Sequence, residues 1–283
     1  MRPGPFCLAV TLVLGILAGC ASAPASAPTR SGSEEPIPDV MPPPTVPAEP
    51  ERRPAPTPPP PTVPDVAFTA GHSVLSRPIG VRVLGDGPDV VLLLSTIHGN
   101  EAVGTPLLER LGAHLKANPH LLAGRTVILV PNANPDGCRN NTRGNIRGVD
   151  LNRNFPSRNF RGRRTGGARP LSEPEARALH ALVKQRRPAR VVSLHQPLSL
   201  IDHDGPALSL ARAMAATCSL PVKKLGGRPG SMGSWVGIDL GIPIVTVEFP
   251  RAADLVSEDE LWRRYGPMLL VAVAFDGKPT ARE

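Results

Sequence analysis

Four polar residues that could bind a metal ion or move a proton follow apolar, strand-like segments of this sequence. They are His98, Glu101, His195 and Glu248. His98 and Glu101 are close enough in the chain for a tight turn to direct both side chains at one ion. Two histidines and one carboxylate form the ligand set of an open zinc site, which leaves a fourth position for water. Glu248 would then be free to act as a general base on water that zinc activates.

The elements around these residues predict how they come together. From Val66 onward, apolar strand-like runs alternate with helical patterns, which indicates an α/β fold. We expect a mixed, mostly parallel twisted sheet with helices on both faces. The expected strands are 89–97, 125–130, 190–194 and 242–247, and the expected helices are 103–115, a helix from a capping box at 172–175 to about 187, and 257–275. Ligands bind beyond the carboxyl ends of strands in such sheets, where the four residues lie.

The other histidines carry less weight. A single histidine after a strand is more often a hydrogen-bonded structural residue, so the argument depends on the whole set of four residues. His203 is near enough to His195 to line a site, but we interpret it as a loop residue. Structural or solvated positions are expected for His72, His114, His120 and His180.

Several longer motifs accompany these residues. They are His98-Gly99-Asn100-Glu101, Asn134-Pro135-Asp136-Gly137, the run GVDLNRNFP at 148–156, and Val247-Glu248-Phe249-Pro250. Together and in this order they resemble the zinc carboxypeptidase family, over nearly the whole chain after residue 64. The segments 193–197 (SLHQP) and 233–235 (GSW) are most similar to the murein peptide amidase A branch of that family. Members of that branch cut the γ-D-glutamyl–meso-diaminopimelate bond of cell-wall peptides.

The resemblance implies a role for each of the four residues described first. His98, Glu101 and His195 match the ligands of one zinc ion per catalytic domain, and Glu248 matches the catalytic glutamate. The implied reaction is zinc-dependent hydrolysis of a peptide or γ-D-glutamyl amide bond next to a free carboxylate, with murein peptides as the expected substrates.

Three further positions match residues of the family that contact substrate. Asn152 and Arg153 match the pair that binds the terminal carboxylate, and an arginine fork suits a carboxylate. Arg143 matches the arginine that polarises the scissile carbonyl, and a fixed cation there would stabilise the developing oxyanion. Arg139 and Arg147 lie in the same loop and compete with Arg143 for this assignment.

The sequence departs from the family at the tyrosine that usually covers the substrate. The only tyrosine is Tyr265, which follows Glu248 and lies in an expected helix. The equivalent region is the glycine-rich loop 226–233, in which Arg228 or Ser231 could replace that tyrosine.

Diaminopimelate carries an additional amine and carboxylate, so its pocket needs an acidic residue. The candidates are Asp202, Asp204 and Asp239, of which Asp202 is our choice. For each one taken alone, a solvated loop aspartate remains the simpler interpretation.

The N-terminal region predicts export and lipid attachment. Arg2 precedes a short apolar run, and the sequence Leu17-Ala18-Gly19-Cys20 resembles the lipoprotein box. We therefore expect a signal peptide at 1–19, a lipidated Cys20 with a proline-rich linker at 20–64, and the catalytic domain at 65–283. This organisation places the protein on the periplasmic side of a bacterial envelope membrane, the outer membrane by preference. Cys138 and Cys218 could form a disulfide or remain free thiols.

Composition limits the range of partners. The formal net charge of +8 is compatible with anionic partners, but an arginine-rich genome that gives a basic surface is the preferred explanation. No basic stretch alternates with aromatic residues, so we expect no nucleic-acid binding, and we expect a monomer. Two alternatives stay open: a zinc deacylase of N-acyl amino acids, which shares several of these motifs, and a non-catalytic lipoprotein that binds wall peptides.

Overall fold

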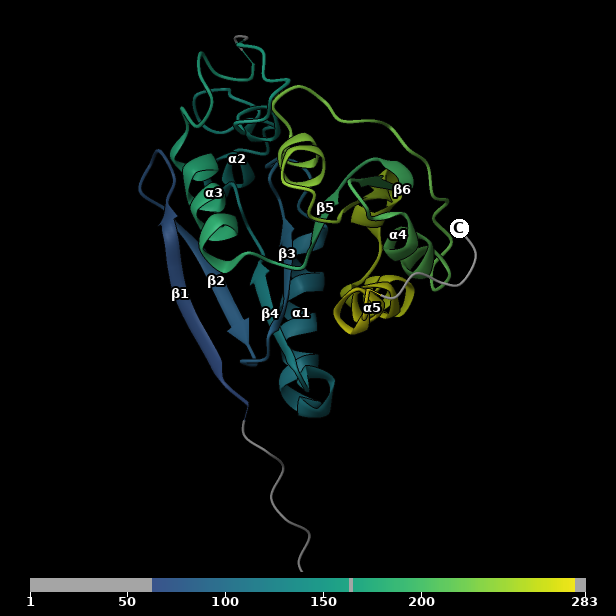
Figure 1. Ribbon diagram of the computed structural model, residues 1–283. Coiled ribbons are helices and arrows are strands. Elements are labelled where there is room, and N and C mark those ends of the chain that lie inside the picture. Colours follow the sequence, from purple (N-terminus) through teal and green to yellow (C-terminus); the bar gives the residue numbers. More distant parts are fainter. Residues whose placement is uncertain (1–62, 163–164, 278–283) are drawn as a thin grey trace, which may run out of the picture. The chain divides into compact units, whose positions relative to one another are not determined.

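A seven-stranded mixed sheet forms the centre of the protein. The structure is a computed structural model that describes residues 63–162 and 165–277 (Figure 1). The strand order is β1-β2-β4-β3-β5-β7-β6. Their bounds are β1 Asp65–His72, β2 Pro78–Leu84, β3 Asp89–Ser95, β4 Arg125–Val130, β5 Arg190–His195, β6 Leu198–Asp204 and β7 Ile244–Pro250. The strands β4, β3, β5 and β7 are parallel, and β1, β2 and β6 pair antiparallel at the two edges.

Helices cover both faces of this sheet, which confirms the predicted fold class. Because side chains alternate along a strand, Val91 and Leu93 of β3 enter one core, and Leu92 and Leu94 enter the other. The first core includes α1 (Gly104–Ala117), α4 (Leu208–Ala215) and α5 (Glu258–Ala274), and the second includes α3 (Pro174–Arg186) and the π-helix η3 (Gly233–Asp239). The remaining short helices are α2 (Pro135–Arg139), η1 (Pro119–Leu122), η2 (Leu151–Arg153) and η4 (Arg251–Leu255). Burial on both faces explains the nearly continuous apolar sequences of β3 and β5.

Two local predictions were wrong. The start of α3 is not a capping box, because its N-cap is Glu173, whose side chain makes no capping hydrogen bond. Instead, Asn154 holds this corner: its Oδ1 accepts from the Glu173 backbone N–H at 3.1 Å, and its Nδ2 donates to Ser172 Oγ at 2.9 Å. The segment containing His203 was interpreted as a loop but forms the edge strand β6.

The predictions for residues 1–62 fall outside the described residues. They concern the signal peptide, Cys20 and nearly all of the linker, and the domain boundary at residue 65 also stays a prediction. The described residues belong to one unit of the chain, and none of their helices has the length and apolar character needed to span a membrane. Cys138 and Cys218 are both free thiols.

Candidate metal centre and substrate cavity

His98 and Glu101, which follow β3, converge with His195, the last residue of β5. Glu101 Oε2 lies 2.9 Å from Nδ1 of each histidine, and the two Nδ1 atoms are 3.1 Å apart. All three side chains are buried. The fold therefore brings two residues of one turn next to a third that is almost a hundred positions away, and we call these three residues the metal cluster.

The chemistry of the metal cluster fits a zinc ion. His98 Nε2 lies 3.0 Å from Asp150 Oδ1, so a neutral ring that donates there directs its Nδ1 lone pair into the cluster. Burial opposes ionisation of Glu101, but hydrogen bonds with His195 and His98 hold the pKa of its carboxyl well below its usual range. Two imidazole nitrogens and one ionised carboxylate are donors that zinc prefers.

Close backbone packing holds the turn that carries His98 and Glu101. A Cβ on Gly99 would lie 2.0 Å from the carbonyl carbon of Gly137, so only glycine allows this approach. Asn134 joins the same two segments, because its Oδ1 accepts from Gly137 N at 3.0 Å and its Nδ2 donates to the Ile97 carbonyl at 3.2 Å. The Asn-Pro-Asp-Gly motif thus supports the turn that carries His98 and Glu101, and none of its residues lines the cavity beside the metal cluster.

Asp150 is a site residue to which sequence reasoning gave no role. Its carboxylate lies against His98 Nε2 and accepts hydrogen bonds from the Asn152 backbone N–H at 2.9 Å and from Arg143 Nε at 3.1 Å. Burial opposes its ionisation, yet the hydrogen bond with His98 and nearby positive charges keep the pKa of Asp150 well below the usual range. The sequence signal that could have identified Asp150 was its position in the motif 148–156, two residues before Asn152.

The structure distinguishes Arg143 from its two neighbours in the loop. Arg143 Nη1 donates to Glu101 Oε1 at 2.9 Å, and its side chain lines the cavity beside the metal cluster. Arg147 lies instead against Glu173 at 3.4 Å, and Arg139 ends α2. Arg143 is half-exposed and uses only two of its five N–H donors in these contacts, so others remain for a ligand.

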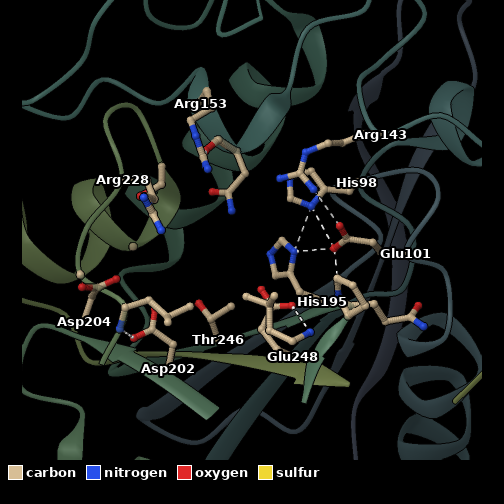
Figure 2. Close-up of a pocket in the computed structure, with 18 residues that line it drawn as sticks. His98, Glu101, Arg143, Arg153, His195, Asp202, Asp204, Arg228, Thr246 and Glu248 are labelled. Carbon is tan, nitrogen blue, oxygen red and sulfur yellow. Dashed lines mark hydrogen bonds and ion pairs between the residues drawn. The ribbon is translucent and has the colours of Figure 1, made fainter. Parts of the chain in front are cut away.

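A cavity of about 230 Å³, which we call the main cavity, opens beside the metal cluster. Figure 2 shows Arg143, His98 and Glu101 on one side and Arg228, Asp202 and Asp204 on the other. The side chains that line it are His98, Glu101, Arg143, Asn152, Arg153, His195, Gln196, Pro197, Leu198, Asp202, Asp204, Leu225, Arg228, Ser231, Thr246 and Glu248. Apart from the candidate Asp239, every residue predicted to contact the zinc ion or the substrate therefore lines one cavity.

Asn152 is held by the loop 226–233, where the family usually carries its covering tyrosine, and Asn152 in turn accepts from Arg153. Asn152 Oδ1 accepts from the Met232 backbone N–H at 2.8 Å, and Arg153 Nη1 donates to the Asn152 carbonyl at 2.6 Å. Ser231 Oγ accepts from Ser234 N at 3.0 Å, whereas Arg228 is exposed at the cavity wall. Tyr265 lies in the core, edge-on to Phe249, and takes no part in the site.

The interpretation of Asp202 and Asp204 as solvated loop residues was wrong. Both lie on β6 and are only 7% and 5% exposed, because β6 pairs with β7 beside Glu248. Asp202 Oδ1 accepts from the backbone N–H groups of His203 and Leu225 at 2.8 Å each, and burial raises the pKa of its carboxyl. Asp239 is outside the main cavity and accepts from Arg158 N at 2.7 Å.

Glu248 stands next to His195 in the parallel register of β5 and β7. Its side chain is half-buried at the wall of the main cavity, and Oε2 accepts from the Leu198 backbone N–H at 3.4 Å. Burial raises the pKa of this carboxyl above its ordinary value. A carboxylate with a raised pKa beside a metal site is suited to accept and release a proton.

Comparison with known proteins agrees with this geometry. The zinc carboxypeptidase family profile matches residues 63–201. Murein peptide amidase A of Escherichia coli (strain K12) is 36% identical over 192 residues, which cover 62% of this chain and 75% of that protein. The gamma-D-glutamyl-L-diamino acid endopeptidase 1 of Lysinibacillus sphaericus is 30% identical over 173 residues, 44% of each chain.

Solved structures give the same result for the fold. The murein-tripeptide amidase from Escherichia coli O157 superimposes with a TM-score of 0.58 and 29% identity, over 75% of this chain and 93% of that one. Bovine thrombin-activatable fibrinolysis inhibitor superimposes with a TM-score of 0.62 at 22% identity, over 75% and 88%. With its His-Glu-His cluster and this degree of similarity, the chain belongs to the zinc carboxypeptidase family and is a zinc-dependent peptidase or amidase.

Proposed function

We propose that this enzyme hydrolyses the γ-D-glutamyl amide bond that precedes a diamino acid with a free carboxylate, in murein peptides. Two relatives whose names specify a murein peptide or a γ-D-glutamyl-diamino acid bond support this substrate class. The observation that carries the proposal is the mixed charge of the main cavity. It contains two buried carboxylates, of Asp202 and Asp204, as well as the guanidinium groups of Arg153 and Arg228.

Those charges match the leaving residue of the proposed substrate. Asn152 and Arg153 would bind its carboxylate next to the scissile bond, since an arginine fork pairs with both carboxylate oxygens. The far end of a diaminopimelate side chain carries an ammonium and a second carboxylate. Asp202 would pair with the ammonium and Arg228 with the carboxylate. A buried acid with a raised pKa gains from a cationic partner, because the partner offsets the cost of burying its charge.

The residues beside the metal cluster supply the remaining steps. Zinc held by His98, Glu101 and His195 would provide a Lewis acid that activates water and polarises a carbonyl. Glu248 takes a proton from the attacking water and passes it to the leaving amine. The free N–H donors of Arg143 stabilise the negative charge that develops on the carbonyl oxygen.

The test uses zinc-loaded protein and the tripeptide L-Ala-γ-D-Glu-meso-diaminopimelate, with free diaminopimelate followed by mass spectrometry. We expect release by the natural sequence. Asp202→Asn should lower kcat/KM roughly ten- to a hundredfold, as expected for loss of a charged hydrogen bond. Asp239→Asn is the matched control, because Asp239 lies outside the main cavity and should leave kcat/KM unchanged. Absence of diaminopimelate release from a protein that holds one zinc ion would refute the substrate.

We also propose that Cys20 carries the lipid that attaches the enzyme to the periplasmic side of the outer membrane. The support is the sequence Leu17-Ala18-Gly19-Cys20 after a short apolar run. In cells fed a labelled fatty acid, the full-length chain should incorporate label, and Cys20→Ala should not. Equal labelling of both proteins would contradict the proposal.

A further inference from the structure

A second cavity of about 250 Å³ adjoins the metal cluster and contains two arginines. It is lined by Asn100, Glu101, Arg143, Gln196, Pro197, Arg251 and Asp254. Arg251 is exposed, and among the described residues its side chain has no hydrogen-bond or ion-pair partner. The mechanism proposed above does not use Arg251. This cavity therefore holds a cation that is free to bind a ligand.

The second cavity adjoins the end of the main cavity that lies beside the metal cluster. It shares Glu101, Arg143, Gln196 and Pro197 with the main cavity. It includes none of the residues at the other end of the main cavity, such as Arg153, Asp202 or Arg228. In Figure 2 Arg228 and Asp202 lie across the main cavity from Arg143 and Glu101. A substrate whose leaving residue fills the end of the main cavity beside Asp202 and Arg228 finds the second cavity open to its acyl part, past Arg143.

One wall of the second cavity is the helix η4, which carries Arg251 and Asp254. Arg251 and Asp254 belong to the 3₁₀ helix η4, in which residues three apart eclipse one another. Asp254 Oδ1 accepts from Gln196 Nε2 at 3.1 Å, and Gln196 Oε1 is buried with no hydrogen-bond partner among the described residues. Gln196 itself is 6% exposed and directly follows His195. A fixed amide therefore connects this wall to the metal cluster.

We infer that the second cavity binds the acyl side of the substrate and that Arg251 recognises an anion there, the α-carboxylate of a γ-linked glutamyl residue. This inference rests on the proposed function, because only a γ-linked glutamate leaves its α-carboxylate free. In such a residue the α-carboxylate carbon is four bonds from the scissile carbonyl carbon, about 5 Å when extended. An α-linked residue without an acidic side chain offers an arginine no negative charge there, and an α-linked glutamate has its amide N–H next to the scissile carbonyl and not next to its carboxylate.

Asp254 is placed to accept a hydrogen bond from the amide N–H of the same γ-linked glutamate. The α-carbon of the γ-linked glutamate carries its carboxylate and an amide N–H side by side. Arg251 would donate to the carboxylate, while Asp254 would accept from the N–H, since the two side chains extend from the same face of η4. The pair would thus distinguish a γ-D-glutamyl bond from an ordinary peptide bond.

The experiment compares two substrates with the full-length, zinc-loaded enzyme. One is L-Ala-γ-D-Glu-meso-diaminopimelate, and the other is the same tripeptide with the glutamyl α-carboxylate converted to a carboxamide. We expect the natural sequence to prefer the carboxylate form in kcat/KM by roughly ten- to a hundredfold. Arg251→Gln should remove most of that preference, and Arg251→Lys should restore part of it because it returns the charge without the fork.

Arg169→Gln is the control, because it removes the same charge from an exposed position that lines neither cavity. It should keep the preference of the natural sequence. Equal hydrolysis of the two substrates by the natural sequence, or an undiminished preference in Arg251→Gln, would overturn the inference and leave the proposed function standing. Hydrolysis of neither substrate would overturn both.

Discussion

The carboxylate of Asp150 lies 3.0 Å from Nε2 of His98, on the side of the ring that faces away from the metal cluster. This contact fixes which nitrogen of His98 carries the proton and therefore which one is available to a metal. The same carboxylate also holds Arg143 and the backbone of Asn152, so one buried group orients a residue of the metal cluster, a cation at the cavity wall and the first of the two residues predicted to bind a carboxylate.

Asp150→Asn should weaken zinc binding more than it weakens the fold. An amide cannot accept from His98 Nε2 as strongly as a carboxylate, so we expect zinc affinity to fall about ten- to a hundredfold. Competition with a chelator of known affinity measures this change. Asp86→Asn, at an exposed position between β2 and β3, is the control and should bind zinc like the natural sequence.

Glu248→Gln should separate metal binding from catalysis. The amide keeps the size of the side chain but cannot take a proton, so kcat should fall by about 10²–10⁴-fold while the zinc content stays at one per chain. Metal analysis and a rate measurement on the same sample test both parts. Glu258→Gln changes an exposed residue at the start of α5 and should alter neither quantity; a full rate in Glu248→Gln would exclude Glu248 as the base.

Gly99→Ala should damage the site through its backbone. The added methyl group would lie 2.0 Å from the backbone of Gly137, so the turn carrying His98 and Glu101 must move away. We expect a loss of about 1–3 kcal/mol in the free energy of unfolding, as for an overpacked core, together with weaker zinc binding. Gly80→Ala is the matched control, because a Cβ on Gly80 meets no atom within 4 Å. Equal stability of the two variants would show that the turn adapts freely.

The stability of the protein should depend on Asp136 in a pH-dependent way. Burial raises the pKa of this carboxyl, but the hydrogen bonds from Leu75 N and Arg77 lower it by more than burial raises it. The folded-state pKa therefore lies below the ordinary value. A group of this kind stabilises the fold above its unfolded pKa of about 3.9 and loses that contribution as the pH falls through the folded value.

At pH 7 we expect Asp136→Asn to lower the free energy of unfolding by about 1.5–3 kcal/mol, the range for hydrogen bonds to charged groups. The difference from the natural sequence should shrink as the pH falls below about 4. Urea unfolding at a series of pH values measures it. A difference that stays constant down to pH 3 would mean that the charge of Asp136 contributes nothing.

Much of the fold was predictable because it depends on local patterns. The apolar runs of β3, β4 and β5 indicate buried strands, and their ends place polar residues at one edge of the sheet. β6 was missed because its sequence, LSLIDHD, ends in acids and histidine, which are uncommon in strands. Pairing with β7 and cover from η3 give these residues their burial, and neither contact is encoded locally.

The sequence by itself predicted the residues of the metal cluster, Glu248 and the pair Asn152 and Arg153, because each belongs to a short motif whose residue types restrict its chemistry. Only the tertiary structure decided which of three neighbouring arginines faces the cavity, that Asp150 supports His98, and that Asp202 and Asp204 are buried in the main cavity. It alone places Arg251 beside Gln196 in a second cavity. These relationships join residues that are far apart in the chain, and long-range packing, which leaves no periodic signal in the sequence, brings them together.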